Sequence, residues 1–156
     1  MDEFQRNEIK GRSWFSRFVN ETQRDSVFVP AENINETIDG FLKTGTSSYV
    51  IEIKTRNKEY ERYKTHWIEI DKYMNMVNWQ AKTKSRKAYY VNFFDWDTVY
   101  IYDLKNVNSQ TCDIVSRWVW EKTVIGNKKV LKRFFDIPRG YARIYKWENY
   151  KWKRTQ

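Results

Sequence analysis

The sequence has very few of the residues that form disulfides and zinc sites. Among its 156 residues there are one cysteine, Cys112, and one histidine, His66. One cysteine cannot form an intramolecular disulfide, and one cysteine with one histidine cannot supply a zinc site of the usual kind. We expect Cys112 to be a small buried or half-buried residue. We assign His66 no catalytic role, because no partner serine or cysteine nucleophile is evident.

Long apolar runs, glycine and proline are scarce as well. No apolar run reaches about 18 residues, so no membrane-spanning helix is expected. The first residues, Met1 to Arg6, lack the apolar core of a signal peptide. The 5 Gly and 2 Pro are spread thinly, and no internal repeat or linker is visible. These absences predict one cytosolic domain over residues 1–156, with no membrane partner.

Positive charge and aromatic side chains are what the sequence has in excess. Lys and Arg number 29 against 20 Asp and Glu, which gives a net charge of +9. Such a charge favours a polyanionic partner, most simply nucleic acid, although the same charge also serves solubility alone. Aromatic residues make up 18% and include 8 Trp and 11 Tyr. They can fill a core or stack on nucleobases.

Apolar spacing predicts two helices separated by strands. The first helix covers Asp2 to about Asn20, and its expected buried stripe is Phe4, Phe15, Phe18 and Val19. A strand or an extended loop follows over Ser26–Pro30. The second helix is predicted over Trp67–Lys84, and its expected buried stripe is Ile70, Met74 with Tyr73, Val77 and Ala81.

More strands are expected after the second helix. They form two hairpins: 88–94 with 98–102, and 118–120 with 130–131 around a turn at Gly126-Asn127. The basic, aromatic tail from Tyr141 is either a final strand whose aromatics belong to the core, which we favour, or a base-stacking surface. The predicted fold class is α/β, with a mixed central β-sheet flanked by helices.

An earlier hairpin carries the residues suited to chemistry. Its strands are predicted at Glu36–Leu42 and Ser48–Thr55. If Gly45-Thr46 is a two-residue loop, Asp39 lies opposite Glu52 on the same face, with roughly 5 Å between their Cβ atoms. Longer turns are equally allowed. In the two-residue register, the two carboxylates repel each other unless a cation lies between them.

Asp39, Glu52 and Lys54 together suit metal-dependent cleavage of phosphodiesters. Alternation along a strand places Glu52 and Lys54 on one face. The two carboxylates and the backbone carbonyl of Ile53 are oxygen ligands of the kind that Mg²⁺ prefers, and Mn²⁺ is expected to substitute. Lys54 could orient or deprotonate the attacking water and meet the developing negative charge. The alternative is an ordinary exposed Glu–Lys pair on an edge strand.

These residues resemble the core motif of the PD-(D/E)XK nuclease superfamily. Ile38-Asp39-Gly40 and Tyr49–Thr55 match the motif, with Ile38 where its name has proline, and a helix and a strand follow in the same order. The superfamily has the restriction-endonuclease-like fold and includes archaeal-type Holliday-junction resolvases and many phage nucleases. The resemblance covers about Glu36–Leu104 and is weak in the C-terminal third.

The resemblance implies a set of site residues. Asp39 and Glu52 match the metal-binding acids, and Lys54 matches the catalytic lysine. Many members carry a further acid on the first helix, which binds the metal or orients a metal-bound water, and Glu8 matches it best. The alternative for Glu8 is a solvated residue paired with Arg12.

The second helix and two basic runs supply candidate contacts to nucleic acid. Lys72 resembles a polar helix residue that members aim toward the site, where it could bind the scissile phosphate, and Gln80 is a weaker candidate of the same kind. An exposed helix lysine is favoured for Lys72, because it lies away from the predicted apolar stripe. The candidates in the basic runs are Arg56, Lys58, Lys82, Lys84, Arg86 and Lys87. Solvated loops are the alternative for these runs.

The favoured function is that of a Mg²⁺-dependent endonuclease acting on DNA. Likeness to resolvases suggests a branched DNA substrate, a phage or mobile-element origin, and a homodimer whose two sites cut two strands. The alternative is a non-catalytic nucleic-acid-binding module of the same fold, against which the intact Asp39, Glu52 and Lys54 argue. A third interpretation is a structural protein with a basic surface, which would show no salt-sensitive affinity for DNA.

Overall fold

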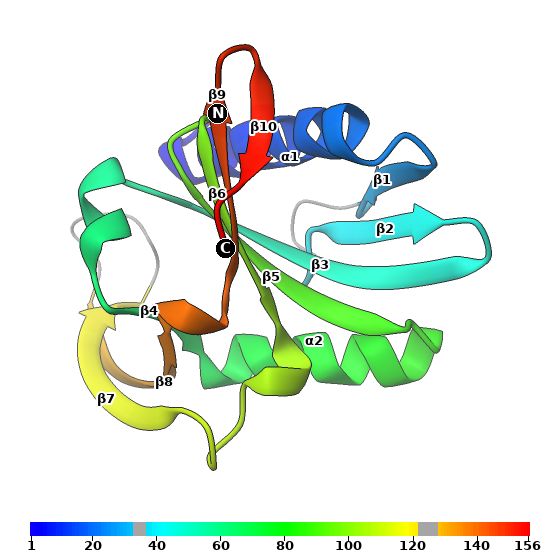
Figure 1. Ribbon diagram of the computed structural model, residues 1–156. Helices are drawn as coiled ribbons and strands as arrows, with labels where there is room; N and C mark the ends of the chain where they lie inside the picture. The colour runs from blue at the N-terminus through cyan, green and yellow to red at the C-terminus, as the bar shows by residue number, and fades with distance from the viewer. Residues whose placement is uncertain (33–36, 122–127) are drawn as a thin grey trace.

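Two sheets and two helices make up the fold. The computed structural model describes residues 1–32, 37–121 and 128–156. Within them, a seven-stranded sheet has the order β1-β2-β3-β5-β6-β9-β10 and a three-stranded sheet has the order β4-β8-β7. Helix α1 covers one face of the large sheet and α2 lies against the other (Figure 1). The strands β3 and β5 are parallel and the remaining pairs antiparallel, so the predicted mixed α/β fold is confirmed.

The elements have the following bounds. The helices are α1 (Glu3–Thr22) and α2 (Ile70–Thr83), with short 3-10 helices η1 (Lys58–Arg62), η2 (Leu104–Asn106) and η3 (Arg139–Tyr141). The strands are β1 (Ser26–Pro30), β2 (Gly40–Thr44), β3 (Ser47–Arg56), β4 (Thr65–Glu69), β5 (Lys87–Phe94), β6 (Thr98–Asp103), β7 (Asp113–Trp120), β8 (Lys129–Pro138), β9 (Arg143–Glu148) and β10 (Lys151–Arg154). In the described residues, no helix combines the length and the apolar character that crossing a membrane requires.

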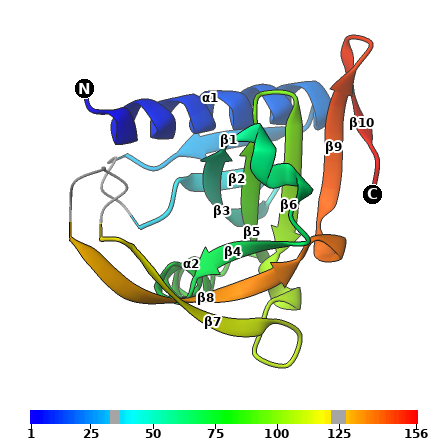
Figure 2. The ribbon, with the colours of Figure 1, turned by 90° about the vertical axis from the view of Figure 1, so that its left-hand side faces the viewer.

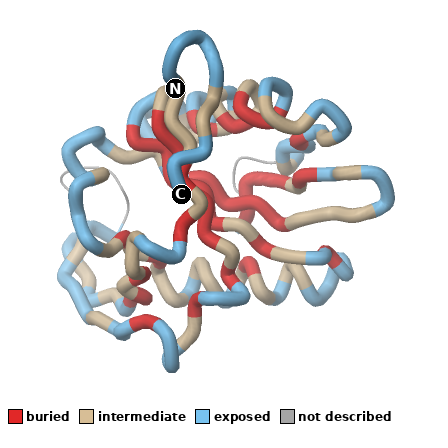
Figure 3. Tube along the Cα trace, viewed as in Figure 1, coloured by how far each residue is buried: buried red, intermediate tan, exposed pale blue. Residues whose placement is uncertain are grey.

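The large sheet separates two apolar cores. One lies under α1 and includes Phe18 and Ile51, and the other lies on the α2 side and includes Val50 and Met76. Both draw on β3, because successive side chains of a strand point to opposite faces. The buried segments run through the middle of the sheet, with exposed segments around the periphery (Figure 3). A strand buried on both faces is a stable base for a site.

Helix α1 matches its predicted range, but one residue of its buried stripe is wrong. A capping box fixes its start, where Gln5 N donates to the Asp2 carboxylate over 2.8 Å. Its buried residues are Gly11, Phe15, Phe18 and Val19. Phe4 is 39% exposed, because the helix is buried against the sheet only from Gly11 onward.

The predicted register of the β2–β3 hairpin is confirmed from the turn as far as Gly40, the residue after Asp39. Thr44 pairs with Ser47 and Gly40 with Ile51, as a two-residue turn requires. The strand begins at Gly40, however, so the expected strand over residues 37–39 and the direct Asp39–Glu52 pair are wrong. Glu36, where the strand was expected to begin, lies outside the described residues. Gly40 has a φ of +155°, and a Cβ there would lie 2.3 Å from the Val29 carbonyl oxygen. Asp39 precedes the strand, although its backbone N–H still donates to the Ile51 carbonyl over 3.1 Å.

The second helix begins later than predicted, and its buried stripe is only partly the predicted one. Trp67–Glu69 belong to β4, where they pair with β8, so α2 begins at Ile70. Met76 is fully buried, whereas Met74 is 47% exposed and Ala81 is also exposed. The partly buried residues beside Met76 are Ile70, Tyr73 and Trp79. Two neighbouring stripes of this helix are apolar, and the sheet covers the one with the aromatic residues.

The C-terminal half forms the expected strands and extends them. β5 pairs with β6, and β7 pairs with β8 through Trp118–Leu131, both as predicted. The turn proposed at Gly126-Asn127 lies outside the described residues. The tail forms β9 and β10, and the Trp152 ring meets Phe18 of α1 edge-on at 5.1 Å. This supports the core interpretation of the tail over a stacking surface.

His66 and Cys112 are both buried. The His66 Nδ1 atom lies 2.5 Å from the Tyr102 hydroxyl, and burial lowers the pKa of His66 to about 4. A neutral histidine inside an aromatic cluster has a structural role. This agrees with the expectation that His66 takes no part in catalysis. Cys112 is a small core residue, as expected.

Candidate active site

Three carboxylic acids and a lysine come together where β2 begins beside β3. Helix α1 supplies Glu8, the residue before β2 supplies Asp39, and β3 supplies Glu52 and Lys54. Glu8, Asp39 and Lys54 line one small pocket together with the buried Gly11 of α1, and Glu52 lines the neighbouring cleft. Gly11 brings α1 close to β3, since a Cβ there would lie 3.1 Å from Ile53 Cγ2. The sequence-predicted core of the site is therefore brought together.

The carboxylate of Asp39 is fixed from two sides. Its Oδ2 atom accepts a hydrogen bond from Ile53 N over 2.7 Å, and its Oδ1 atom accepts one from Arg12 Nε over 3.1 Å. Arg12 also donates to the Ala31 carbonyl over 3.3 Å. Arg12 therefore serves Asp39 and is not the partner of a solvated Glu8. Sequence reasoning missed this role, although Arg12 lies one helical turn after Glu8 on the same side.

Glu52 is paired with Lys72 of α2. Lys72 Nζ lies 2.9 Å from Glu52 Oε1 and also donates to the Thr37 carbonyl over 3.2 Å. The favoured alternative, an exposed helix lysine, is therefore wrong. The error follows from the misplaced stripe of α2, because Lys72 lies one turn before the buried Met76 and so borders the buried face.

The acids raise one another's pKa values. Burial is the main cause that raises the pKa of Glu52 to about 8, and the nearby charge of Asp39 adds to it, against the opposing effect of Lys72. Burial likewise raises the pKa of Glu8 to about 7, followed by a hydrogen bond to Asp39 and repulsion from it. Burial and mutual repulsion disfavour the charged forms of Glu8 and Glu52, and a divalent cation bound beside them would offset both effects.

Lys54 lies at the solvent-exposed edge of the site, where it lines both the small pocket and the wider cleft. The residue is exposed and forms none of the ion pairs found between described residues. The displacement of water around its amine lowers its pKa, Arg56 adds repulsion, and Glu52 and Glu8 oppose the effect. An amine without a partner next to buried acids is free to meet a substrate.

The residues of the site fit a divalent cation with oxygen ligands. Within the described ranges, no three His, Cys, Asp or Glu side chains are already gathered as a metal-binding group. Mg²⁺, however, commonly uses one or two carboxylates and completes its shell with water. In an extended strand the N–H and C=O of a residue point to the same side, so the Ile53 carbonyl leaves β3 on the side of Asp39. Two carboxylates and this carbonyl are a suitable donor set for a hard cation.

A wider cleft opens on the other side of Glu52. Its lining combines Glu52, Lys54 and Lys72 with Trp67 of β4 and with residues of the β7–β8 hairpin. Figure 2 places β7 and β8 on the side of the large sheet opposite α1. Sequence reasoning did not connect this hairpin with the site, because the pairing of β4 with β8 joins residues about 70 positions apart. No local pattern indicates such a contact.

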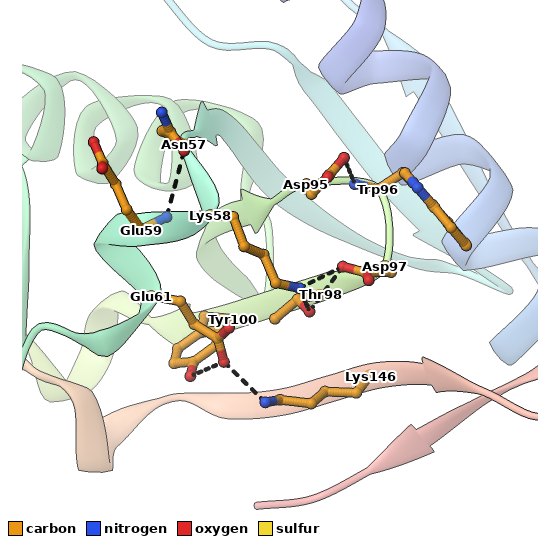
Figure 4. A network of polar contacts seen from close by, with 10 residues as sticks. All are labelled: Asn57, Lys58, Glu59, Glu61, Asp95, Trp96, Asp97, Thr98, Tyr100 and Lys146. Atoms are coloured by element: carbon orange, nitrogen blue, oxygen red, sulfur yellow. Dashed lines mark hydrogen bonds and ion pairs between the residues drawn. The ribbon is translucent and has the colours of Figure 1, made fainter.

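Two predicted nucleic-acid contacts near the site also have partners within the protein. Arg56 Nε donates to Asn92 Oδ1 over 2.6 Å, and its Nη2 donates to the Trp67 carbonyl over 2.8 Å. Lys58 Nζ lies 2.6 Å from Asp97 Oδ1, where it ties η1 to the β5–β6 turn (Figure 4). Arg56 still borders the cleft, so it remains a candidate contact.

The other predicted contacts lie at the far end of the strands. Lys87 pairs with Tyr49 at one end of the β3–β5 ladder, whereas Asn92 pairs with Lys54 at the other, roughly 17 Å away. Residues in this distant group are Gln80, Lys82, Lys84, Arg86 and Lys87. Gln80 donates to the Arg86 carbonyl over 3.3 Å and supports the end of α2. The structure does not bring this group to the acids, and its contact with nucleic acid stays a prediction.

The fold and the acid–acid–lysine arrangement define the class of the protein: an α/β protein of the restriction-endonuclease-like fold. No protein-family model matches the chain, and no curated protein matches its sequence. Among solved structures it is similar to Hjc of Archaeoglobus fulgidus, a Holliday junction resolvase from an archaeal hyperthermophile. The TM-score is 0.52 at 14% identity, over 85% of this chain and 87% of that chain. The resemblance inferred from the motif is thereby confirmed for the fold.

Proposed function

We propose that the protein is a metal-dependent DNA endonuclease that hydrolyses phosphodiester bonds. The observation that carries this proposal is the meeting of Asp39, which directly precedes β2, with Glu52 and Lys54 of β3 in a restriction-endonuclease-like fold. Glu8 and Lys72 join the same cluster from two helices. We further propose branched DNA as the substrate, because the similar Archaeoglobus protein is a Holliday junction resolvase.

Asp39, Glu52 and the Ile53 carbonyl would hold Mg²⁺, or Mn²⁺ in its place. When bound, the ion supplies charge neutralisation at the phosphate and an acidified water. Arg12 and the Ile53 amide keep Asp39 in one orientation, so little rearrangement of that side chain is needed. Lys54 orients the attacking water and stabilises the negative charge that develops on the phosphate. Glu8 accepts a hydrogen bond from water, and Lys72 offers its ammonium to the phosphate.

Cleavage of labelled substrates tests the proposal. A panel of linear duplex, single strand, flap, four-way junction and RNA is incubated with Mg²⁺ or Mn²⁺. We expect cleavage of the branched DNA and a loss of at least about 100-fold in rate for Lys54→Ala, which removes a group that acts in the transition state. Lys43→Ala, at an exposed position of β2, is the matched control and should retain full activity. Equal rates for the parent and Lys54→Ala would contradict the role of Lys54.

Metal binding is tested separately by calorimetric titration with Mn²⁺. Asp39→Asn and Glu52→Gln should each weaken binding at least tenfold, since each removes a charged ligand. Unchanged Mn²⁺ affinity in both variants would contradict the proposed ligands. A parent protein that binds DNA but cleaves none of the substrates with either ion would favour the non-catalytic binding module instead.

Paired cleavage of a junction requires two sites, and the described residues of one chain contain one acid–acid–lysine cluster. We therefore propose a homodimer as the active form. Sedimentation of the protein with and without a four-way junction measures its oligomeric state. A monomer that nevertheless cuts both strands of a junction symmetrically would contradict the dimer.

A further inference from the structure

The β7–β8 hairpin displays an uncovered apolar surface. Trp118 pairs directly with Leu131, and the two residues are 68% and 56% exposed. The same face of the hairpin enters the core at its base, where Phe135 and Ile137 are buried. Contiguous exposed apolar surface often marks an interaction site. The adjacent, exposed Trp118 and Leu131 therefore suggest a binding surface.

This surface meets the cleft of the candidate active site at Trp120. Trp120, the last residue of β7, lines the cleft together with Lys54 and Lys72. Trp118 lies two residues earlier on the same face of the strand, roughly 7 Å away, which is about the rise of two nucleotides along a strand. The cleft itself is lined by the other face of the hairpin, through Val119, Lys132 and Phe134. A chain that leaves the cleft past Trp120 would therefore cross the end of the hairpin to reach Trp118.

The charges around the surface indicate what covers it. Over residues 115–121 and 128–134 the hairpin carries one acid, Glu121, and five basic residues: Arg117, Lys128, Lys129, Lys132 and Arg133. Lys129 Nζ lies 5.1 Å from the centre of the Trp120 ring, and Arg117 lies 4.2 Å from that of Trp67. The core of a protein–protein interface is usually depleted of charge. Aromatic rings among cations are instead the arrangement that binds single-stranded nucleic acid.

We propose that Trp118 and Trp120, supported by Leu131, form a stacking surface for unpaired nucleobases of a strand entering the cleft. The inference rests on the proposed function in that the ligand is nucleic acid, and it deepens that function by adding a preference for substrates with unpaired bases. Lys128, Lys129 and Arg133 attract the phosphates of the strand, and the rings select bases that are not already stacked in a duplex.

Equilibrium binding without cleavage tests the proposal. Fluorescence anisotropy in EDTA measures the Kd of the full chain for a labelled single strand, a flap and a blunt duplex of the same sequence. We expect Trp118→Ala and Trp120→Ala each to weaken binding of the single strand and the flap about tenfold, since stacking is worth roughly 1–3 kcal/mol per base. Binding of the blunt duplex should change less than about twofold, because its bases are stacked on one another.

Two further variants serve as controls. Trp96→Ala removes a tryptophan of similar exposure to Trp120 from the β5–β6 turn and should leave all three Kd values unchanged. Trp118→Tyr keeps a ring and should retain most of the affinity, whereas Trp118→Leu keeps only apolar character and should not. Thermal unfolding verifies that each variant is folded, which the exposure of Trp118 makes the expected result.

Three outcomes would overturn the stacking surface. They are unchanged binding of the single strand by Trp118→Ala, equal losses on the single strand and the duplex, and a change from dimer to monomer in Trp118→Ala that Trp118→Leu reverses. The last outcome identifies a protein interface. Cleavage in Mg²⁺ separates this proposal from the previous one: a cleaving parent with an unaffected Trp118→Ala contradicts only the stacking, and selective stacking without any cleavage contradicts only the nuclease.

Discussion

Asp39 and Arg12 form a nearly buried ion pair, whose side chains are 4% and 14% exposed. We predict that Arg12→Leu destabilises the protein by about 3 kcal/mol, because it leaves a buried carboxylate without its counter-charge. In an Asp39→Asn background the same change should cost clearly less, since no charge remains to be compensated. Urea unfolding of the four proteins in EDTA measures this coupling. Additive effects would show that the two side chains do not stabilise each other.

His66 is buried among aromatic residues, and its pKa lies at about 4. Burial is the main cause, followed by repulsion from Arg56. In the unfolded chain its pKa returns to its ordinary value of about 6.5, so the unfolded state binds the proton more readily. The contribution of His66 is therefore fully present above pH 6.5 and is lost as the pH falls toward 4.

We predict that the parent loses about 2 kcal/mol more stability than His66→Phe between pH 7 and pH 5. The variant has no titrating ring at position 66. The titration of Glu8 and Glu52 affects both proteins equally, so it cancels when the two losses of stability are subtracted. At pH 7 the variant should itself be less stable by about 1–3 kcal/mol, because the buried Tyr102 hydroxyl loses its partner. Urea unfolding at both pH values gives the four free energies. Parallel losses in the two proteins would contradict the low pKa of His66.

At the scale of the elements, α1 and β3 approach closely at Gly11. A Cβ on that residue would lie 3.1 Å from Ile53 Cγ2 and 3.2 Å from Thr55 Cγ2. We predict that Gly11→Leu destabilises the protein by about 1–2 kcal/mol, since overpacking costs more than the gain in helix propensity. It should also slow cleavage at least tenfold, because α1 carries Glu8 and Arg12 to the site. Unfolding and cleavage assays measure the two effects.

Gly140→Leu is the matched control for Gly11→Leu. Nothing lies within 4 Å of a Cβ at this position, so the larger side chain meets open space. The control should retain the stability and the cleavage rate of the parent. If Gly11→Leu behaved like the control, the spacing between α1 and β3 would not position the site.

The apolar pattern of α2 predicts a helix but does not decide which of its faces is buried. Its residues are apolar on two neighbouring stripes, one through Met74 and one through Met76. Only the sheet decides that Met76 is buried, and this choice turns Lys72 toward Glu52. The helix itself was predictable from periodicity, but its rotation about its own axis was not.

At the scale of the whole molecule, the net charge of +9 should govern affinity for nucleic acid. We predict that the Kd for DNA rises at least about tenfold between 50 and 200 mM salt, because bound cations are released from the phosphates. The double variant Lys84→Glu with Arg86→Glu should have a smaller salt slope if the far end of the sheet contacts DNA. Its rate of cleavage at saturating substrate should not change, since this end lies away from the acids.

The double variant Lys151→Glu with Arg154→Glu controls for net charge. It changes the total charge by the same amount, but on β10, an exposed strand at one edge of the large sheet. We expect a smaller effect on the salt slope than at residues 84 and 86. Equal effects would mean that net charge alone, and not the location of the basic residues, sets the affinity.

The amino-acid sequence by itself determined which residues form the candidate site: Asp39, Glu52 and Lys54 lie close along the chain, and strand alternation with a short turn brings them together. It also determined most strands, because period-two alternation and turns are local features. The tertiary structure alone decided that Arg12 holds Asp39, that Lys72 faces Glu52 and that the β7–β8 hairpin borders the cleft. These contacts depend on how helices rotate and how distant strands pair, and such choices are set by the packing of the whole chain.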